Sequence, residues 1–390
     1  MNDRTPVEAR TPSVQTRLPT VGTTIFTVMS ALATEHGAVN LGQGFPDFDC
    51  DPALVDAVAA AMRSGQNQYP PMAGIPRLRE LIAAKIETLY GRRYDPATEV
   101  TVTAGATQAI LNAVLAFVGP GDEAIILEPS YDSYAPNIEL AGARVVRVPL
   151  TPGSFAPDFD RIAAALTPRT RLILINSPHN PSGTLWSAEE LSQLEALLRD
   201  TSVVVISDEV YEHMVYGGEH QGVARFPELA ARSVIVSSFG KTYHVTGWKV
   251  GYAVAPAPLM AEFRKVHQFN VFTVNTPMQH GLAAYMASGS HHLALPGFYR
   301  AKRDLFAAGL ARTRLRPLPC QGTFFQCVDY SAVSSLPEAD FCRWLTTEIG
   351  VAAIPLSAFY AEGFDQHIAR FCFAKKDETL VAAAERLARL

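Results

Sequence analysis

The sequence predicts an α/β fold, in which a large domain with a mostly parallel seven-stranded sheet is joined to a smaller α+β domain. Over the first two-thirds of the chain, β-branched runs alternate with segments of helical periodicity, a pattern typical of parallel sheets covered by helices. From about Ala283 the rhythm changes to longer helices and fewer strands. The length of 390 residues also exceeds what one hydrophobic core usually holds, which favours two domains.

The predicted elements of the large domain follow one another in regular order. Strands are predicted at 99–103, 123–127, 144–148, 171–175, 203–207, 234–237 and 249–254. Helices are predicted between several of them, at 106–118, 158–166 and 188–198. Because ligands of such sheets bind beyond the carboxyl ends of the strands, residues just after the strands are the candidates for a site.

The two ends of the chain are predicted to form the smaller unit. Its helices are predicted at 25–36, 298–311 and 338–349, and its strands at 323–328 and 368–373. The expected division is an N-terminal arm that packs with the small domain (1–45), a large domain (46–283) and a small C-terminal domain (284–390).

Composition and charge exclude several classes of function. A net charge of −5 gives no attraction to nucleic acid or anionic membranes, and no apolar run is long enough to span a bilayer. The five cysteines form no CxxC pair, and no histidines have metal-ligand spacing. Residues 1–17 lack the apolar core of a secretion signal, so we expect a cytoplasmic protein without a metal.

Lys241 is the first candidate for chemistry, in a short Ser/Gly turn after the strand 234–237. Partial desolvation there would lower the pKa of its amine toward nucleophilic use, whereas an ordinary solvated loop lysine is the alternative. The stretch 240–242 resembles the end of a phosphate-binding P-loop, but Ile235 stands where that motif requires a glycine.

Asp208 and Tyr211 follow the neighbouring strand 203–207. A carboxylate at a buried strand end requires a cationic partner, which is either a protonated ring nitrogen or an Arg or Lys; a plain helix cap is the alternative. An amine, a carboxylate and a phenol at adjacent strand ends suit a carbonyl-bearing heteroaromatic cofactor.

Two further positions suit anionic groups. Ala106 and Thr107 open a helix directly after a strand, so their N–H groups and the Thr107 hydroxyl could bind phosphate, or simply cap the turn. Arg370 lies in an apolar strand, where a guanidinium suits bidentate binding of a carboxylate or an ion pair with a surface acid.

Together these motifs resemble those of a known family, the class I aminotransferases, which are pyridoxal-phosphate enzymes of fold type I. The resemblance extends from about Thr20 to the C-terminus, and within the class the chain is similar to kynurenine and bacterial methionine aminotransferases. The motifs that carry it are 41–47 (LGQGFPD), 67–69 (NQY), 105–108 (GATQ), 180–183 (NPSG), 208–211 (DEVY), 238–241 (SFGK) and Arg370.

The resemblance implies a role for each matching residue. Lys241 would bind the cofactor covalently and transfer the substrate proton, Asp208 would keep the pyridine nitrogen protonated, and Tyr211 and Asn180 would bind the ring hydroxyl. Tyr131 would stack on the ring. The phosphate contacts would be Ala106, Thr107, Ser238, Lys249 (often an arginine in the class) and, from the second subunit of a homodimer, Tyr69.

The resemblance also implies a substrate site. The α-carboxylate would be bound by Arg370, Asn180 and the Gly44 backbone, and the side chain by Phe26, Tyr131, Phe272 and Phe359. Such an aromatic wall favours methionine or aromatic amino acids, with a 2-oxo acid as acceptor. A β-lyase acting on cysteine conjugates or cystathionine, and a non-catalytic binding protein on the same fold, remain alternatives.

Overall fold

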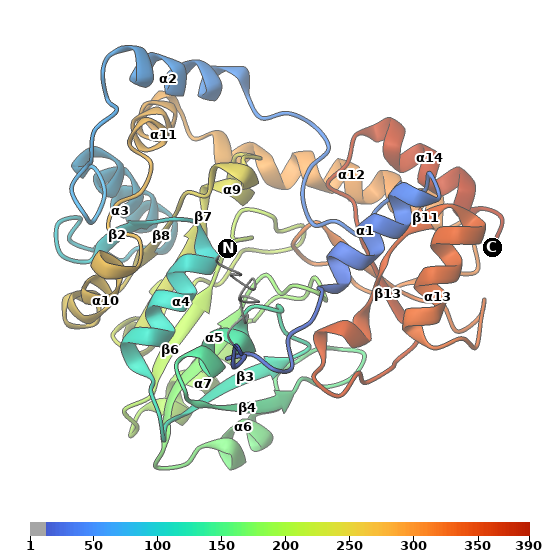
Figure 1. The fold of residues 1–390 in the computed structure, drawn as a ribbon, viewed down its shortest axis with the longest axis horizontal. Helices are drawn as coiled ribbons and strands as arrows, with labels where there is room; N and C mark the ends of the chain where they lie inside the picture. The colour runs from blue at the N-terminus through green and yellow to red at the C-terminus, as the bar shows by residue number, and fades with distance from the viewer. Residues whose placement is uncertain (1–12) are drawn as a thin grey trace, which may run out of the picture.

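The computed structural model describes residues 13–390, and its central element is a seven-stranded sheet in the order β2-β8-β7-β6-β5-β3-β4 (Figure 1). All neighbouring strands pair in parallel except β8, which is antiparallel to both β2 and β7. The strands are β2 (Val100–Thr103), β3 (Glu123–Glu128), β4 (Arg144–Pro149), β5 (Thr170–Asn176), β6 (Val204–Asp208), β7 (Ser233–Ser238) and β8 (Gly251–Val254). The predicted mostly parallel sheet is therefore confirmed.

Helices cover both faces of this sheet because its strands are apolar on both sides. Leu172 and Ile206 pack on one face in a core shared with α4 and α10, whereas their neighbours Ile173 and Val205 belong to the core that includes α3 and α7. The helices of this part are α2 (Pro52–Arg63), α3 (Pro76–Tyr90), α4 (Ala106–Phe117), α5 (Tyr134–Leu140), α6 (Phe159–Ala165), α7 (Ala188–Leu198), α8 (Pro227–Ala230), α9 (Phe239–Thr242), α10 (Ala257–Asn270) and α11 (Thr276–Ser288).

A second unit surrounds a four-stranded sheet of order β12-β13-β10-β9, on the right of Figure 1. The short strands β1 and β11 pair in parallel, so the N-terminal segment packs against residues more than three hundred positions later. The elements are α1 (Ile25–Glu35), β1 (Val39–Asn40), α12 (Leu295–Leu310), β9 (Arg316–Pro317), β10 (Phe325–Asp329), α13 (Glu338–Trp344), β11 (Val351–Ala352), β12 (Ile354–Pro355), β13 (Ile368–Cys372) and α14 (Asp377–Leu387).

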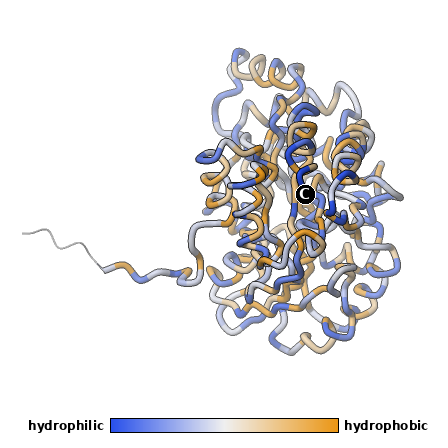
Figure 2. The backbone as a smooth tube through the Cα atoms, turned by 90° about the vertical axis from the view of Figure 1, so that its right-hand side faces the viewer, coloured by the Kyte–Doolittle hydropathy of each residue, from blue (hydrophilic) through white to orange (hydrophobic). Residues whose placement is uncertain are grey.

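The division of the chain into 1–45, 46–283 and 284–390 stays a prediction. The first twelve residues of the N-terminal arm lie outside the described residues, and α11 runs through position 283. Figure 2 shows the segment before α1 projecting from the body, and residues 13–17 are exposed.

One local expectation was wrong. Lys241 lies in the one-turn helix α9, because the Ser238 hydroxyl accepts a hydrogen bond from the Gly240 N–H and caps the helix, whereas the sequence pattern indicated only a turn. The predicted helix 338–349 is α13 followed by a π-helical turn over Leu345–Ile349. Within residues 13–390, no helix combines the length and apolar character needed to cross a membrane.

Candidate active site

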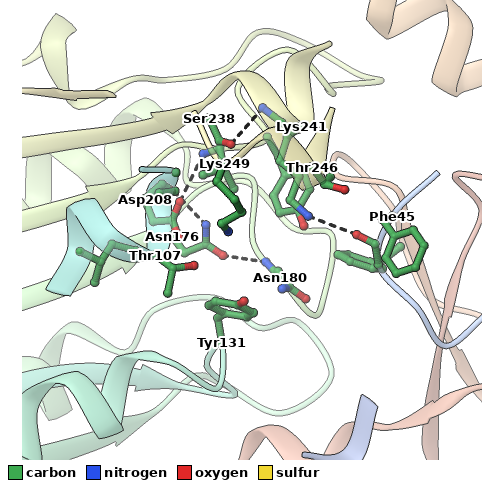
Figure 3. A pocket seen from close by; sticks show the side chains of 18 of the residues that line it. Phe45, Thr107, Tyr131, Asn176, Asn180, Asp208, Ser238, Lys241, Thr246 and Lys249 are labelled. Atoms are coloured by element: carbon green, nitrogen blue, oxygen red, sulfur yellow. Dashed lines mark hydrogen bonds between the residues drawn. The ribbon is translucent and has the colours of Figure 1, made fainter. Parts of the chain in front are cut away.

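A cavity of about 270 Å³ lies where the ends of β6 and β7 meet the start of α4 and the strand β13 of the smaller unit. Twelve of the fifteen residues predicted for the site line it. They are Phe26, Gly44, Ala106, Thr107, Tyr131, Asn180, Asp208, Tyr211, Ser238, Lys241, Lys249 and Arg370. Figure 3 shows several of these side chains arranged around one space, with Tyr131 on one side and Lys249 and Asp208 on the other.

Asp208 is a buried carboxylate that has no cationic partner among the described residues. Its oxygens accept hydrogen bonds from the Tyr134 hydroxyl at 2.6 Å and the Val210 N–H at 3.3 Å, and among residues 13–390 no Lys, Arg or His lies within salt-bridge distance of it. Burial raises the pKa of Asp208 to about 6, although the bond from Tyr134 opposes the rise. An Arg or Lys partner, one of the two predicted possibilities, is therefore absent from this part of the chain. The carboxylate is left to pair with a cation bound in the cavity.

Lys241 reaches into the cavity from α9. Its Nζ donates a hydrogen bond to the Gly44 carbonyl at 3.1 Å and lies 5.5 Å and 5.3 Å from the ring centroids of Tyr211 and Phe324. Loss of hydration lowers the pKa of Lys241 to about 8, which agrees with the desolvated lysine expected from the sequence. An amine of this pKa is partly neutral near pH 8 and can act as a nucleophile or as a base.

The start of α4 provides an anion site. Gly105 precedes the helix with φ of 80°, and among the described residues no side chain caps the helix, so its first N–H groups, including those of Ala106 and Thr107, are not bound by a capping side chain. Lys249 brings its ammonium to this turn, because a Cβ built on Gly105 would lie 3.4 Å from Lys249 Nζ. The Ser238 hydroxyl also lines this end of the cavity. The N–H groups of an uncapped helix start, a hydroxyl and an ammonium suit a phosphate.

Arg370 brings a positive charge to the cavity from β13. It is 1% exposed, and its guanidinium donates to Asn180 Oδ1 at 2.7 Å and to the Gly42 carbonyl at 3.2 Å. The guanidinium lies 3.9 Å from the Phe325 ring centroid, and its Nε has no hydrogen-bond partner in the part of the chain that the structure describes. All of these partners are neutral, so the predicted alternative of a surface ion pair is wrong. The charge is free to bind a carboxylate.

Aromatic rings enclose the Arg370 end of the cavity. Phe26 lines it, and Phe359 packs behind Phe26 with a centroid separation of 6.0 Å and edge-to-face geometry. The Arg370 guanidinium lies 5.3 Å and 5.0 Å from these two centroids. Phe359, which the resemblance places in the substrate wall, therefore supports the wall without lining the cavity.

Two predicted residues lie outside the cavity of their own chain. Tyr69 is 81% exposed and Phe272 is 44% exposed, and their rings pack against each other at 5.4 Å. Neither residue lines the space that contains Lys241. A single copy of the chain thus leaves both rings facing solvent.

The cavity residues that the sequence reasoning missed include three with polar side chains. Asn176 lies at the carboxyl end of β5, beside its register partner Asp208 on β6, so the rule that ligands bind beyond the carboxyl ends of the strands could have found it. Its Oδ1 accepts a hydrogen bond from the Asn180 N–H at 2.7 Å. Tyr134 and Thr246 also line the cavity, and no feature of the sequence distinguishes them from other residues of their type.

Comparison with known proteins identifies the family. The model of the family "Aminotransferase class I and II" matches residues 36–387. The chain belongs to this family. It is 54% identical over 367 residues to the methionine aminotransferase of Escherichia coli (strain K12), covering 94% of this chain and 95% of that protein. It is 36% identical over 394 residues to human kynurenine–oxoglutarate transaminase 1, covering 91% and 93%.

Solved structures agree with this assignment. An E. coli protein described as having a methionine aminotransferase function superposes with a TM-score of 0.95 at 53% identity, covering 97% of this chain and all of that one. N-succinyldiaminopimelate aminotransferase of Mycobacterium tuberculosis superposes with a TM-score of 0.92 at 44% identity, covering 97% and 100%. The predicted fold type I and the predicted pyridoxal-phosphate dependence are confirmed. The protein is an aminotransferase, an enzyme that exchanges an amino group between an amino acid and a 2-oxo acid.

The cavity fits pyridoxal phosphate on three independent features. The unpaired Asp208 carboxylate suits the protonated ring nitrogen, the uncapped start of α4 suits the phosphate, and the Lys241 amine suits the aldehyde carbon. All three groups face the same cavity. Within residues 13–390, Asp208 has no cationic partner and the start of α4 has no capping side chain.

Proposed function

We propose that the enzyme transfers the amino group of methionine or of an aromatic amino acid to a 2-oxo acid. The observation that carries this proposal is the setting of Arg370, a buried guanidinium with neutral partners beside the ring of Phe26. The guanidinium suits the α-carboxylate, and the adjacent ring suits an apolar or aromatic side chain. The relatives named for methionine and kynurenine support the same class.

The cationic residues of the cavity support a preference against acidic donors. Among the described lining residues they are Lys241, Lys249 and Arg370. Two of these lie at the proposed cofactor and its phosphate, so a second substrate carboxylate would remain unpaired. Burying an unpaired carboxylate is costly.

The lining of the cavity and the resemblance to the family support the proposed residue roles. Asp208 would pair with the ring nitrogen, Tyr131 would pack against the ring face, and Tyr211 and Asn180 would contact the ring hydroxyl. Ala106, Thr107, Ser238 and Lys249 would hold the phosphate. When bound, the cofactor supplies an electron sink for negative charge at the substrate α-carbon.

Lys241 is the proposed acid–base group. With a pKa of about 8 its amine can take the proton from the α-carbon of the donor amino acid and, in the reverse half-reaction, deliver a proton to the α-carbon of the amino acid formed from the 2-oxo acid. Arg370 and the Gly44 backbone hold the α-carboxylate, which fixes the α-carbon relative to this amine. The Phe26 ring excludes water from the same end.

We also propose that the enzyme is a homodimer in which Tyr69 and Phe272 complete the site of the second subunit. The exposure of both rings, their mutual contact and their position outside the cavity of their own chain support this arrangement. Sedimentation of a fully active monomer would contradict it. A cytoplasmic location stays a prediction.

One absorbance experiment tests the proposed reaction. Methionine added to the cofactor-loaded enzyme should convert the cofactor to its aminated form, and a 2-oxo acid should restore the starting spectrum. Across a panel of donors, methionine and phenylalanine should exceed aspartate and glutamate in kcat/KM. A preference for the acidic donors contradicts the substrate proposal, and release of pyruvate and ammonia from cysteine conjugates as the main reaction favours a β-lyase. Lys241→Ala is the control that should abolish turnover.

A further inference from the structure

A three-residue backbone segment passes between two lysines at the wall of the cavity. On one side, Lys241 Nζ donates to the Gly44 carbonyl at 3.1 Å. On the other side, Lys375 Nζ donates to the carbonyls of Gln43 and Phe45 at 3.3 Å and 2.8 Å. The carbonyls of consecutive residues therefore alternate between the two amines.

Lys375 is an unusual buried charge. It is 4% exposed, and within residues 13–390 no carboxylate lies within salt-bridge distance of it. Its ammonium is compensated by the two carbonyls and by the Phe45 ring, whose centroid is 5.3 Å away. Because a buried ammonium is costly without hydrogen bonds, these contacts strongly restrict the backbone that provides them.

We propose that Lys375 is a positioning residue that holds the segment Gln43–Phe45 so that the Gly44 backbone faces Lys241 and the substrate carboxylate. The inference rests on the proposed function, in which the Gly44 backbone contacts that carboxylate. Phe45 itself lines the cavity, so the same two hydrogen bonds also place its ring there. Lys375 acts through the segment and does not line the cavity.

The neighbouring residue provides a matched control. Lys376 is exposed, and its backbone N–H donates to Asp47 Oδ1 at 2.6 Å. A Lys376→Met variant keeps that backbone contact and removes the same charge one position along the chain. Any difference between the Lys375→Met and Lys376→Met variants therefore measures the effect of the hydrogen bonds from Lys375 to the Gln43 and Phe45 carbonyls.

The test compares Lys375→Met with Lys376→Met and the wild type in the cofactor-loaded enzyme. The probe is 3-phenylpropanoate, which has a carboxylate and an apolar side chain but no amine. We expect its Kd to rise about tenfold in Lys375→Met, and to stay within about twofold in Lys376→Met. Hydrogen exchange of the amides at 42–46 should accelerate in Lys375→Met alone, whether or not cofactor is bound.

The result that overturns the proposal is the same Kd and the same exchange at 42–46 in both variants. If Lys375→Met does not fold, Lys375→Gln replaces it, because its polar amide is neutral but is carried on a side chain one bond shorter. That side chain should not reach both carbonyls, so wild-type Kd and wild-type exchange in Lys375→Gln also overturn the proposal. The exchange measurement needs no turnover. A failure of the proposed reaction would appear instead as a wild-type enzyme that methionine does not aminate.

Discussion

Two buried carboxylates four residues apart, Asp208 and Glu212, differ in their partners, and we expect one to act in catalysis and the other to stabilise the fold. Asp208 ends β6 and faces the cavity, where within residues 13–390 its side chain accepts hydrogen bonds only from the Tyr134 hydroxyl and the Val210 N–H. Glu212 is equally buried, but it forms an ion pair with Lys85 at 2.6 Å. The same short stretch of chain thus carries one incompletely paired carboxylate and one fully paired carboxylate.

The surroundings of Glu212 lower its pKa, whereas those of Asp208 raise the pKa of Asp208. Its carboxylate also accepts from Tyr90 at 2.6 Å, Ser237 at 2.7 Å and Tyr252 at 3.0 Å. Burial alone would raise the pKa of Glu212, but Lys85, His213 and the hydrogen bond from Tyr90 hold it well below its usual range. The pKa of Asp208 is instead raised to about 6. A carboxylate whose charge lacks compensation is the one available to a bound cation.

This contrast continues along the neighbouring strands. Ser237 and Tyr252 belong to the Glu212 network, whereas the adjacent Ser238 lines the cavity and Gly251 packs closely against the turn before α4. Successive residues of a strand point to opposite faces. Residues on one face of β7 and β8 therefore line or adjoin the cavity. Residues on the other face form hydrogen bonds to the buried ion pair between Lys85 and Glu212.

The largest expected effect is on activity when Asp208 is changed. In Asp208→Asn the side chain keeps its shape but loses the charge that pairs with the ring nitrogen, so kcat/KM should fall by about 10³-fold or more. The unfolding free energy of the protein without cofactor should not fall, because an uncompensated buried charge is removed. Steady-state kinetics and chemical denaturation measure the two effects. Near-normal turnover would contradict the assignment of Asp208.

The reverse pattern is expected for Glu212. In Glu212→Gln the ammonium of Lys85 remains buried without its partner, so the unfolding free energy should fall by about 3–5 kcal/mol. Denaturation of the cofactor-free protein measures this loss. The double variant Lys85→Met/Glu212→Gln should recover part of the stability, and a double variant as unstable as Glu212→Gln would show that the pair is not the main contribution.

The two carboxylates also predict opposite responses of stability to pH. Because the folded-state pKa of Asp208 is raised from about 4 to about 6, the folded protein binds this proton more tightly than the unfolded chain. Its ionisation therefore costs about 2 kcal/mol of stability as pH rises from 4 to 7. The lowered pKa of Glu212 stabilises the protein above pH 4.5, and that contribution is lost as pH falls below this value.

The comparison of wild type with Asp208→Asn measures this response in the cofactor-free protein. The unfolding free energy of the variant relative to wild type should increase from pH 4.5 to pH 7, by about 2 kcal/mol. A difference that is constant over this range would show that Asp208 has an ordinary pKa. Glu212 ionises below this range in the folded state and is common to both proteins, so it does not contribute to the difference.

The sequence was sufficient for most of the sheet and for the charged residues of the cavity. Strand ends are marked by runs of apolar residues, and the strand-end rule brings Asp208 and Lys241 to one edge. The sequence did not distinguish Asp208 from Glu212, because their different environments depend on Lys85 from α3 and on Tyr134, which are distant in the chain. Which polar groups meet across such distances is decided by tertiary packing.

The smallest expected effect concerns the hydroxyl groups on the two carboxylates. Tyr134→Phe removes a 2.6 Å hydrogen bond from Asp208, which should raise the pKa of that carboxyl further and lower kcat/KM by about tenfold. Tyr90→Phe removes the corresponding 2.6 Å bond from Glu212 and should cost about 1 kcal/mol of stability with kcat/KM unchanged. Kinetics and denaturation of both variants give a matched pair. If the two substitutions lower kcat/KM equally, the proposal that Asp208 serves catalysis and Glu212 serves stability is wrong. Loss of a hydroxyl group would then have the same effect on activity at either carboxylate.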